Sequence, residues 1–128
     1  MRLLLDTHVF IWWDSSPEKL SAEARQLCQD GSNTLILSVA SVWEMQIKNQ
    51  LGKLTLNRPL PALVQSQEQS NGIEILSVQL AHIYALETLP SHHKDPFDRL
   101  LIAQAQAEGL TLLSMDPVLR QYPVAVLG

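Results

Sequence analysis

Acidic side chains at four positions along the chain are of the type that binds divalent metal ions. Asp6 and Asp116 each follow a short aliphatic run, and Glu44 and Asp98 lie in segments with helical punctuation. Two carboxylates 4 Å apart repel each other by roughly 4 kcal/mol at an effective dielectric constant near 20. A cluster of three or four would therefore need bound cations, and hard oxygen ligands suit Mg²⁺ or Mn²⁺. If the fold gathers these acids, we expect them to support chemistry by a metal-activated water.

Three of these acids also fit a simpler role at the start of a helix. Asp6 could cap a helix over Thr7–Trp13. The run Asp95-Pro96-Phe97-Asp98 has an acid at the N-cap and proline at the first helical position, which is a good helix start by itself. Asp116-Pro117 repeats that pattern. The capping and the metal-binding interpretations both stay open from these residues alone.

Glu44 lies at the edge of an apolar stripe in a segment with helical spacing. At 100° per residue this stripe consists of Val39, Trp43, Ile47 and Leu51. We expect the stripe to face the protein and Glu44 to lean toward the interior, where a carboxylate needs a partner or a metal ion. The alternative is an ion pair with Lys48, four residues further on, which contributes only about 0.3–0.5 kcal/mol.

The elements that must position these acids alternate between two kinds of segment. Short aliphatic runs are typical of strands buried on both faces: Arg2–Leu5, Thr34–Leu37, Ile73–Leu76, Leu110–Leu113 and Val124–Leu127. Between them lie segments with helical punctuation: Ser21–Asp30, Val39–Leu51, Leu60–Asn71, Val78–Leu86 and Pro96–Glu108. This alternation predicts an α/β fold with a mostly parallel sheet of about five strands and helices on both faces. Its carboxyl edge would gather most of the acids.

Length and composition limit the remaining possibilities. The 128 residues fit one domain, which we place at 1–128, and 46% hydrophobic against 17% charged residues disfavours disorder. A single cysteine, Cys28, and the lack of a long apolar stretch favour a reduced, cytoplasmic location without a membrane segment. The net charge of −4 argues against a broad basic surface for nucleic acid. It does not exclude a nuclease that obtains positive charge from metal ions.

Four motifs occur in order across essentially the whole chain. They are Leu4–His8, Ser38–Glu44, His93–Ala105 and Leu112–Asp116. Each motif is weakly specific alone, but with this order and spacing the chain resembles the PIN-domain ribonucleases, and within them the VapC-type toxins of toxin–antitoxin pairs. The resemblance implies a central parallel sheet with an acidic pocket at its carboxyl edge.

The resemblance also implies roles for individual residues. The acids of the family fall on Asp6, Glu44, Asp98 and, at a more variable position, Asp116. In the family such acids hold Mg²⁺ or Mn²⁺ and hydrolyse RNA. Asp95 precedes a family acid by three positions, so we expect it to be the helix cap.

The same resemblance extends to neighbouring side chains and to partners. Thr7 and Ser114 match small hydroxyl residues that line the pocket in the family. A cognate antitoxin protein and a homodimer are also implied. Because a chain of charge −4 repels RNA, contact with the substrate needs local cations, and Arg99 and Lys94 are the candidates. Ordinary surface charges, or for Arg99 an ion pair, are the alternative for these two residues.

Rival functions receive less support. A phospho-acceptor receiver would need adjacent acids after the first strand, where Asp6 is followed by Thr7, and a D-x-D phosphatase would need an acid at His8. A non-catalytic interaction protein, whose acidic pocket docks a basic segment of a partner, stays open. We expect His92 and His93 to be solvated loop residues. We expect Trp12, Trp13 and Trp43 to pack in the core or at an interface rather than to stack on bases.

Overall fold

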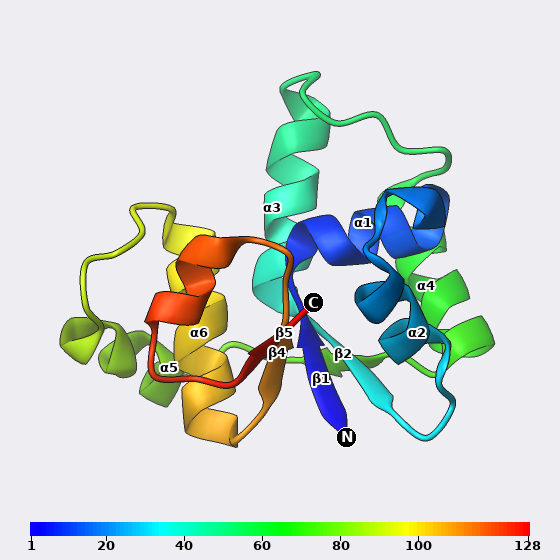
Figure 1. The fold of residues 1–128 in the computed structure, drawn as a ribbon. Helices are drawn as coiled ribbons and strands as arrows, with labels where there is room; N and C mark the ends of the chain where they lie inside the picture. The colour runs from blue at the N-terminus through cyan, green and yellow to red at the C-terminus, as the bar shows by residue number, and fades with distance from the viewer.

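The computed structural model describes residues 1–128, which form a fully parallel sheet of five strands with helices on both faces (Figure 1). The strand order is β3-β2-β1-β4-β5. The strands are β1 (Arg2–Leu5), β2 (Thr34–Ser38), β3 (Glu74–Leu76), β4 (Thr111–Leu113) and β5 (Val126–Leu127). The predicted α/β class and parallel sheet are therefore confirmed.

The aliphatic strands alternate their side chains between two cores. Leu3 and Leu5 of β1 point into the core on one face of the sheet, and Leu4 points into the core on the other. One face is covered by α1 (Thr7–Ser15), α2 (Ala22–Gln29) and α4 (Leu60–Asn71); α5 (Leu80–Ala85) and α6 (Pro96–Glu108) cover the other (Figure 1). Burial on both faces explains why these strands are continuously apolar.

Three short 3-10 helices and one longer α-helix complete the chain. The 3-10 helices are η1 (Pro17–Lys19), η2 (Leu86–Thr88) and η3 (Pro117–Gln121). Helix α3 (Val39–Gln50) begins directly after β2 and extends beyond the carboxyl edge of the sheet (Figure 1). No helix of the chain is both long and apolar enough to cross a membrane.

Local signals set most helix ends as expected. The Ser38 hydroxyl accepts from the backbone N–H of Ala40 at 3.0 Å and so caps α3. Gly72 and Gly109 end α4 and α6 in the left-handed conformation, with φ of +63° and +66°. Gly31 does not act in this way, because α2 ends at Gln29 and an extended Asp30 follows.

The predicted orientation of α3 is wrong. Val39, Trp43 and Leu51 are 43%, 61% and 63% exposed and Ile47 is half-buried, so most of the apolar stripe faces outward. The buried face of the helix instead contains Ala40, Ser41, Glu44 and Met45. The reason is positional: α3 extends beyond the sheet, and the neighbours that it meets there decide which strip is covered (Figure 1). Trp43 packs only edge-on against the ring of Phe97, with centroids 5.3 Å apart.

Replacing Gly109 by alanine should lower the free energy of unfolding by about 1 kcal/mol. The reason is that the left-handed conformation is sterically unfavourable for alanine, whereas glycine adopts it freely. An added Cβ at Gly109 meets no atom within 4 Å, so the loss would come from backbone strain alone. Urea unfolding measures the change. Gly31→Ala is the matched control, because Gly31 has neither positive φ nor a nearby atom. An equal loss in both variants would contradict the assignment.

Candidate active site

Three of the four predicted acids converge on a cavity of about 500 Å³ at the carboxyl edge of the sheet, and Glu44 lies outside its lining. Asp6 follows β1, Asp116 lies just beyond β4, and Asp98 is in the first turn of α6. Together with five other residues they line the cavity: Asp6, His8, Val9, Trp12, His93, Asp98, Met115 and Asp116. The prediction that a parallel sheet gathers distant acids at one edge is therefore confirmed for these three residues.

Asp6 is a buried carboxylate with one oxygen left unused. Its side chain is 5% exposed, and Oδ2 accepts a hydrogen bond from the Ser114 hydroxyl at 2.8 Å. Oδ1 is buried and has no hydrogen-bond partner. The capping alternative is wrong, because the side chain makes no capping bond to α1. Burial raises the pKa of Asp6, so a bound cation would remove an unfavourable charge.

Glu44 is also buried, at 3% exposed, but both of its oxygens have partners. The Thr7 hydroxyl donates to Oε1 at 2.8 Å, and Lys48 Nζ lies 2.6 Å from Oε2. Thr7 has one hydroxyl proton, so the Ser41 hydroxyl 2.9 Å away donates to it in turn. Glu44 thus faces the interior as predicted, and the alternative pair with Lys48 is present as well.

Lys48 is the cation that faces this group of acids. Its side chain is 36% exposed, and its pKa is raised first by the hydrogen bond to Glu44 and further by the charges of Asp95 and Asp98. Lys94 is exposed and makes none of these contacts. The sequence interpretation treated Lys48 only as a surface partner of Glu44. The signal that could have found it is its position four residues after an acid of the candidate site.

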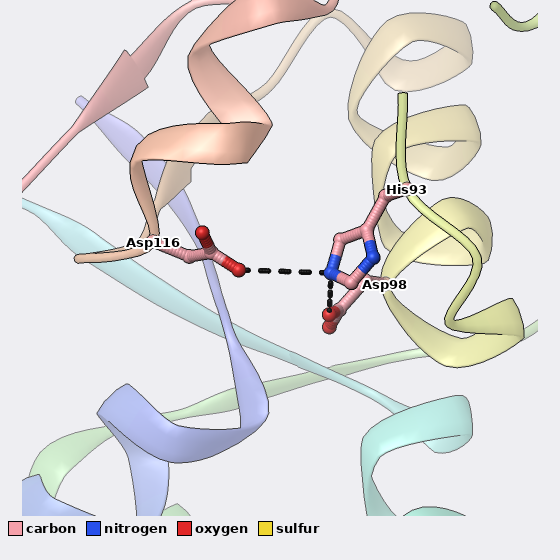
Figure 2. A group of neighbouring side chains, drawn as sticks. All are labelled: His93, Asp98 and Asp116. Atoms are coloured by element: carbon pink, nitrogen blue, oxygen red, sulfur yellow. Dashed lines mark ion pairs between the residues drawn. The ribbon is translucent and has the colours of Figure 1, made fainter. Parts of the chain in front are cut away.

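His93, Asp98 and Asp116 place one donor atom each within 4.8 Å of the others (Figure 2). The His93 Nε2 lies 2.8 Å from Asp98 Oδ2 and 3.6 Å from Asp116 Oδ2. Nε2 is nevertheless buried without a properly directed hydrogen bond. Converging donors that do not satisfy one another are the arrangement that a shared metal ion would complete.

The pKa of Asp98 is raised to about 7. Burial is the largest cause, followed by the negative charges of Asp6 and Asp95, while His93 acts in the opposite direction. Without a metal ion, Asp98 therefore holds its proton far above the usual range for a carboxyl. This is the electrostatic sign of acids that need a cation.

His93 was expected to be solvated, and this expectation is wrong. The backbone N–H of Asp95 approaches its Nδ1 at 3.4 Å, and its Nε2 faces the carboxylates of Asp98 and Asp116. The His93 backbone N–H donates to the Tyr122 hydroxyl at 2.7 Å and fixes the loop. The sequence signal was the position of His93 just before a helix cap, where the chain must turn back across the start of α6.

The capping interpretation is confirmed for two acids. Asp95 Oδ1 accepts from the backbone N–H groups of Phe97 and Asp98 at 2.8 and 3.2 Å. Asp116 Oδ1 accepts from Val118 N–H at 3.0 Å, while its Oδ2 stays directed toward His93. Asp116 therefore combines a cap with a place in the cavity, and one interpretation does not exclude the other.

The predicted substrate-contacting residues lie in different surroundings. Thr7 and Ser114 are buried at 2% and 0% exposed, and they hold the carboxylates of Glu44 and Asp6. The Arg99 guanidinium donates to the backbone carbonyl of Pro90, in the loop before α6, at 2.8 Å and to that of Leu86, in η2, at 3.4 Å. Its contacts fasten the loop that carries His93. The alternative of an ion pair with a neighbouring acid is absent from its contacts.

The family of the chain follows from comparison with known proteins. The PIN domain model matches residues 3–125. The chain belongs to the PIN-domain family. A relative named Ribonuclease VapC22, from Mycobacterium tuberculosis, is 27% identical over 121 residues, which cover 94% of this chain and 91% of the relative. Ribonuclease VapC16 of the same organism is 40% identical over 60 residues, or 47% of this chain and 43% of the relative. This PIN-domain chain is thus a homologue of VapC ribonucleases.

Solved structures agree on the PIN fold. A chain of VapBC2 from Rickettsia felis, crystallised on a DNA fragment from its promoter, has a TM-score of 0.72 at 16% identity and covers 99% of this chain and 98% of that one. A chain of FitAcB from Neisseria gonorrhoeae has a TM-score of 0.64 at 22% identity, with coverage of 98% and 96%. At such identities the likeness shows the fold alone.

Asp98→Asn should stabilise the metal-free protein near pH 8 and have little effect near pH 4. The folded-state pKa of about 7 lies above the usual 3.8, so the wild type loses stability as pH rises between these values and levels off above pH 7. The neutral amide avoids that loss. Thermal unfolding in chelator across this pH range, with exposed Glu18→Gln as control, measures the difference. A stability gain that did not grow with pH would contradict the raised pKa.

Proposed function

We propose that this chain is a divalent-metal-dependent endoribonuclease, acting as the toxin of a toxin–antitoxin pair. The observation that carries the proposal is the cavity in which Asp6, Asp98 and Asp116 converge with an unsatisfied buried carboxylate oxygen. Homology to VapC ribonucleases supports RNA as the substrate. The rival scaffold function has no observation of its own beyond the acidic cavity.

The donor set fits a hard divalent cation. Asp6, Asp98 and Asp116 would hold Mg²⁺ or Mn²⁺, and Glu44 would join them once Lys48 releases its Oε2. When bound, the ion supplies a water of lowered pKa and neutralises the phosphate and the leaving oxygen. His93 Nε2 offers a further donor atom beside the carboxylates of Asp98 and Asp116, and an imidazole ligand would favour Mn²⁺ over Mg²⁺.

The surrounding residues of the chain hold this arrangement in place. Ser114 orients Asp6, Thr7 orients Glu44, and Lys48 brings a positive charge to the acids. No serine, threonine or cysteine lines the cavity, so the chain offers no hydroxyl or thiol nucleophile there. We expect water to attack the phosphorus and the 3′ oxygen to leave, which puts a 5′-phosphate and a 3′-hydroxyl on the products.

Purified protein should cut cellular RNA at few sites in Mn²⁺ or Mg²⁺ and should not cut it in chelator. Asp98→Asn should lower the rate by at least 100-fold, because it removes a charge from the donor set. Sequencing of product ends measures both the sites and the end chemistry. Glu18→Gln, an exposed acid on η1, is the matched control and should retain full activity.

Each other outcome of this assay counts against a definite part of the proposal. Cuts that persist in Asp98→Asn would point to a contaminating nuclease. A 2′,3′-cyclic phosphate would mean attack by the ribose and would overturn the metal-activated water. Binding of a basic peptide without any cleavage by the wild type would favour the docking scaffold instead.

The partners of the chain follow from the same comparison. The solved relatives include toxin–antitoxin complexes, so we propose that a cognate antitoxin binds this chain. Its segment would lay apolar and basic side chains along the acidic cavity and so block the site. A second copy of the chain would cover the exposed apolar stripe of α3, where Val39, Trp43 and Leu51 face outward.

Trp43→Glu should shift a homodimer to monomer, because it places a charge in an apolar interface without touching the core. Trp43 is 61% exposed, so the fold should tolerate the change. Sedimentation velocity at micromolar concentration measures the mass. Gln26→Glu, which adds the same charge to an exposed position of α2, should leave the dimer intact. A monomeric wild type would remove the homodimer from the proposal.

A further inference from the structure

The cavity has a second wall that takes no part in holding the acids. One side of α1 supplies His8, Val9 and Trp12, and Met115 adds a fourth residue from the loop after β4. The His8 side chain is exposed, whereas Trp12 and Met115 are half-buried. An aromatic and apolar surface thus lies in the same cavity as the carboxylates.

The cavity is larger than its metal chemistry requires. At about 30 Å³ per water molecule, an ion with six water ligands fills roughly 200 Å³, whereas the cavity measures about 500 Å³. The remaining space has room for a part of the substrate other than the cleaved phosphate.

Trp12 is held in place as a stacking surface. Its indole packs against the apolar core beneath α1, so the ring does not need to be ordered when a ligand arrives. The His8 ring lies against it with centroids 5.8 Å apart and a tilt of 49°. The tilt leaves the two rings without a full stacking partner in each other.

The charge of the chain makes stacking the more effective source of RNA affinity. No lysine or arginine lines the cavity, and the Arg99 guanidinium is engaged by backbone carbonyls, so neither supplies a phosphate contact inside the cavity. Aromatic stacking attracts a base without positive charge and accepts any base, because every base has a π face. We propose that Trp12, flanked by His8, is the subsite for a nucleobase next to the cleaved phosphate. This inference rests on the proposed ribonuclease function.

The test combines removal of the base with removal of the ring. The probe is an RNA that the wild type cleaves, made with an abasic nucleotide on either side of the mapped bond. In wild type and Trp12→Phe, one abasic position should lower kcat/KM by about tenfold or more. Trp12→Leu keeps apolar volume but has no π face. Its kcat/KM on the intact RNA should already be about tenfold or more below that of the wild type. The abasic change should then have no further effect.

Two controls separate this inference from the proposed function and from misfolding. Tyr84→Ala removes an exposed ring on α5, outside the cavity, and should behave as the wild type. Thermal stabilisation by Mn²⁺ should be the same in Trp12→Leu and wild type, which shows that the acids are intact. An equal abasic penalty in wild type and Trp12→Leu would overturn the subsite while the ribonuclease stood. A wild type that cleaves no RNA would overturn both the proposed ribonuclease function and the base subsite.

Discussion

The burial of carboxylates that also repel one another is the constraint on which the rest of this structure depends. A parallel sheet brings the ends of β1 and β4 together, and the N-terminus of α6 adds Asp98 beside them. The pKa of Asp98 rises to about 7 because burial and the charges of Asp6 and Asp95 oppose its ionisation. The fold therefore stores an unfavourable interaction that a divalent cation would relieve. Sites of this kind reduce stability in exchange for function.

The surroundings of each acid limit this cost in a different way. Glu44 is neutralised by Lys48 and held by Thr7, so its charge is fully partnered. Asp6 has only the Ser114 hydroxyl, and its second oxygen has nothing. The least compensated groups thus border the cavity, and the best compensated acid lies outside its lining. The acids that most need a cation therefore lie together at the cavity.

Features set by nearby residues were predictable from the sequence, and features set by distant contacts were not. The strands, the Asp95 cap and the end of α6 at Gly109 depend on local patterns, so they were found. The α3 stripe was misassigned because helical spacing shows that a face is apolar but not what covers it. His93 was missed because its role exists only where the loop before α6, tied down by Arg99 and Tyr122, meets Asp98 and Asp116.

The balance of charge also bears on how such a chain selects among RNAs. A basic protein binds nucleic acid mainly by releasing counterions, which makes its affinity general and sensitive to salt. This chain has a charge of −4 and an acidic cavity, so the phosphates alone would keep RNA away. If RNA is the substrate, as proposed, a metal ion held by the acids would have to neutralise its phosphate, and contacts of shape and stacking would supply the remaining binding energy. On the proposed function, selectivity would then follow from the weakness of general attraction, because only an RNA that fits the cavity would offset the repulsion.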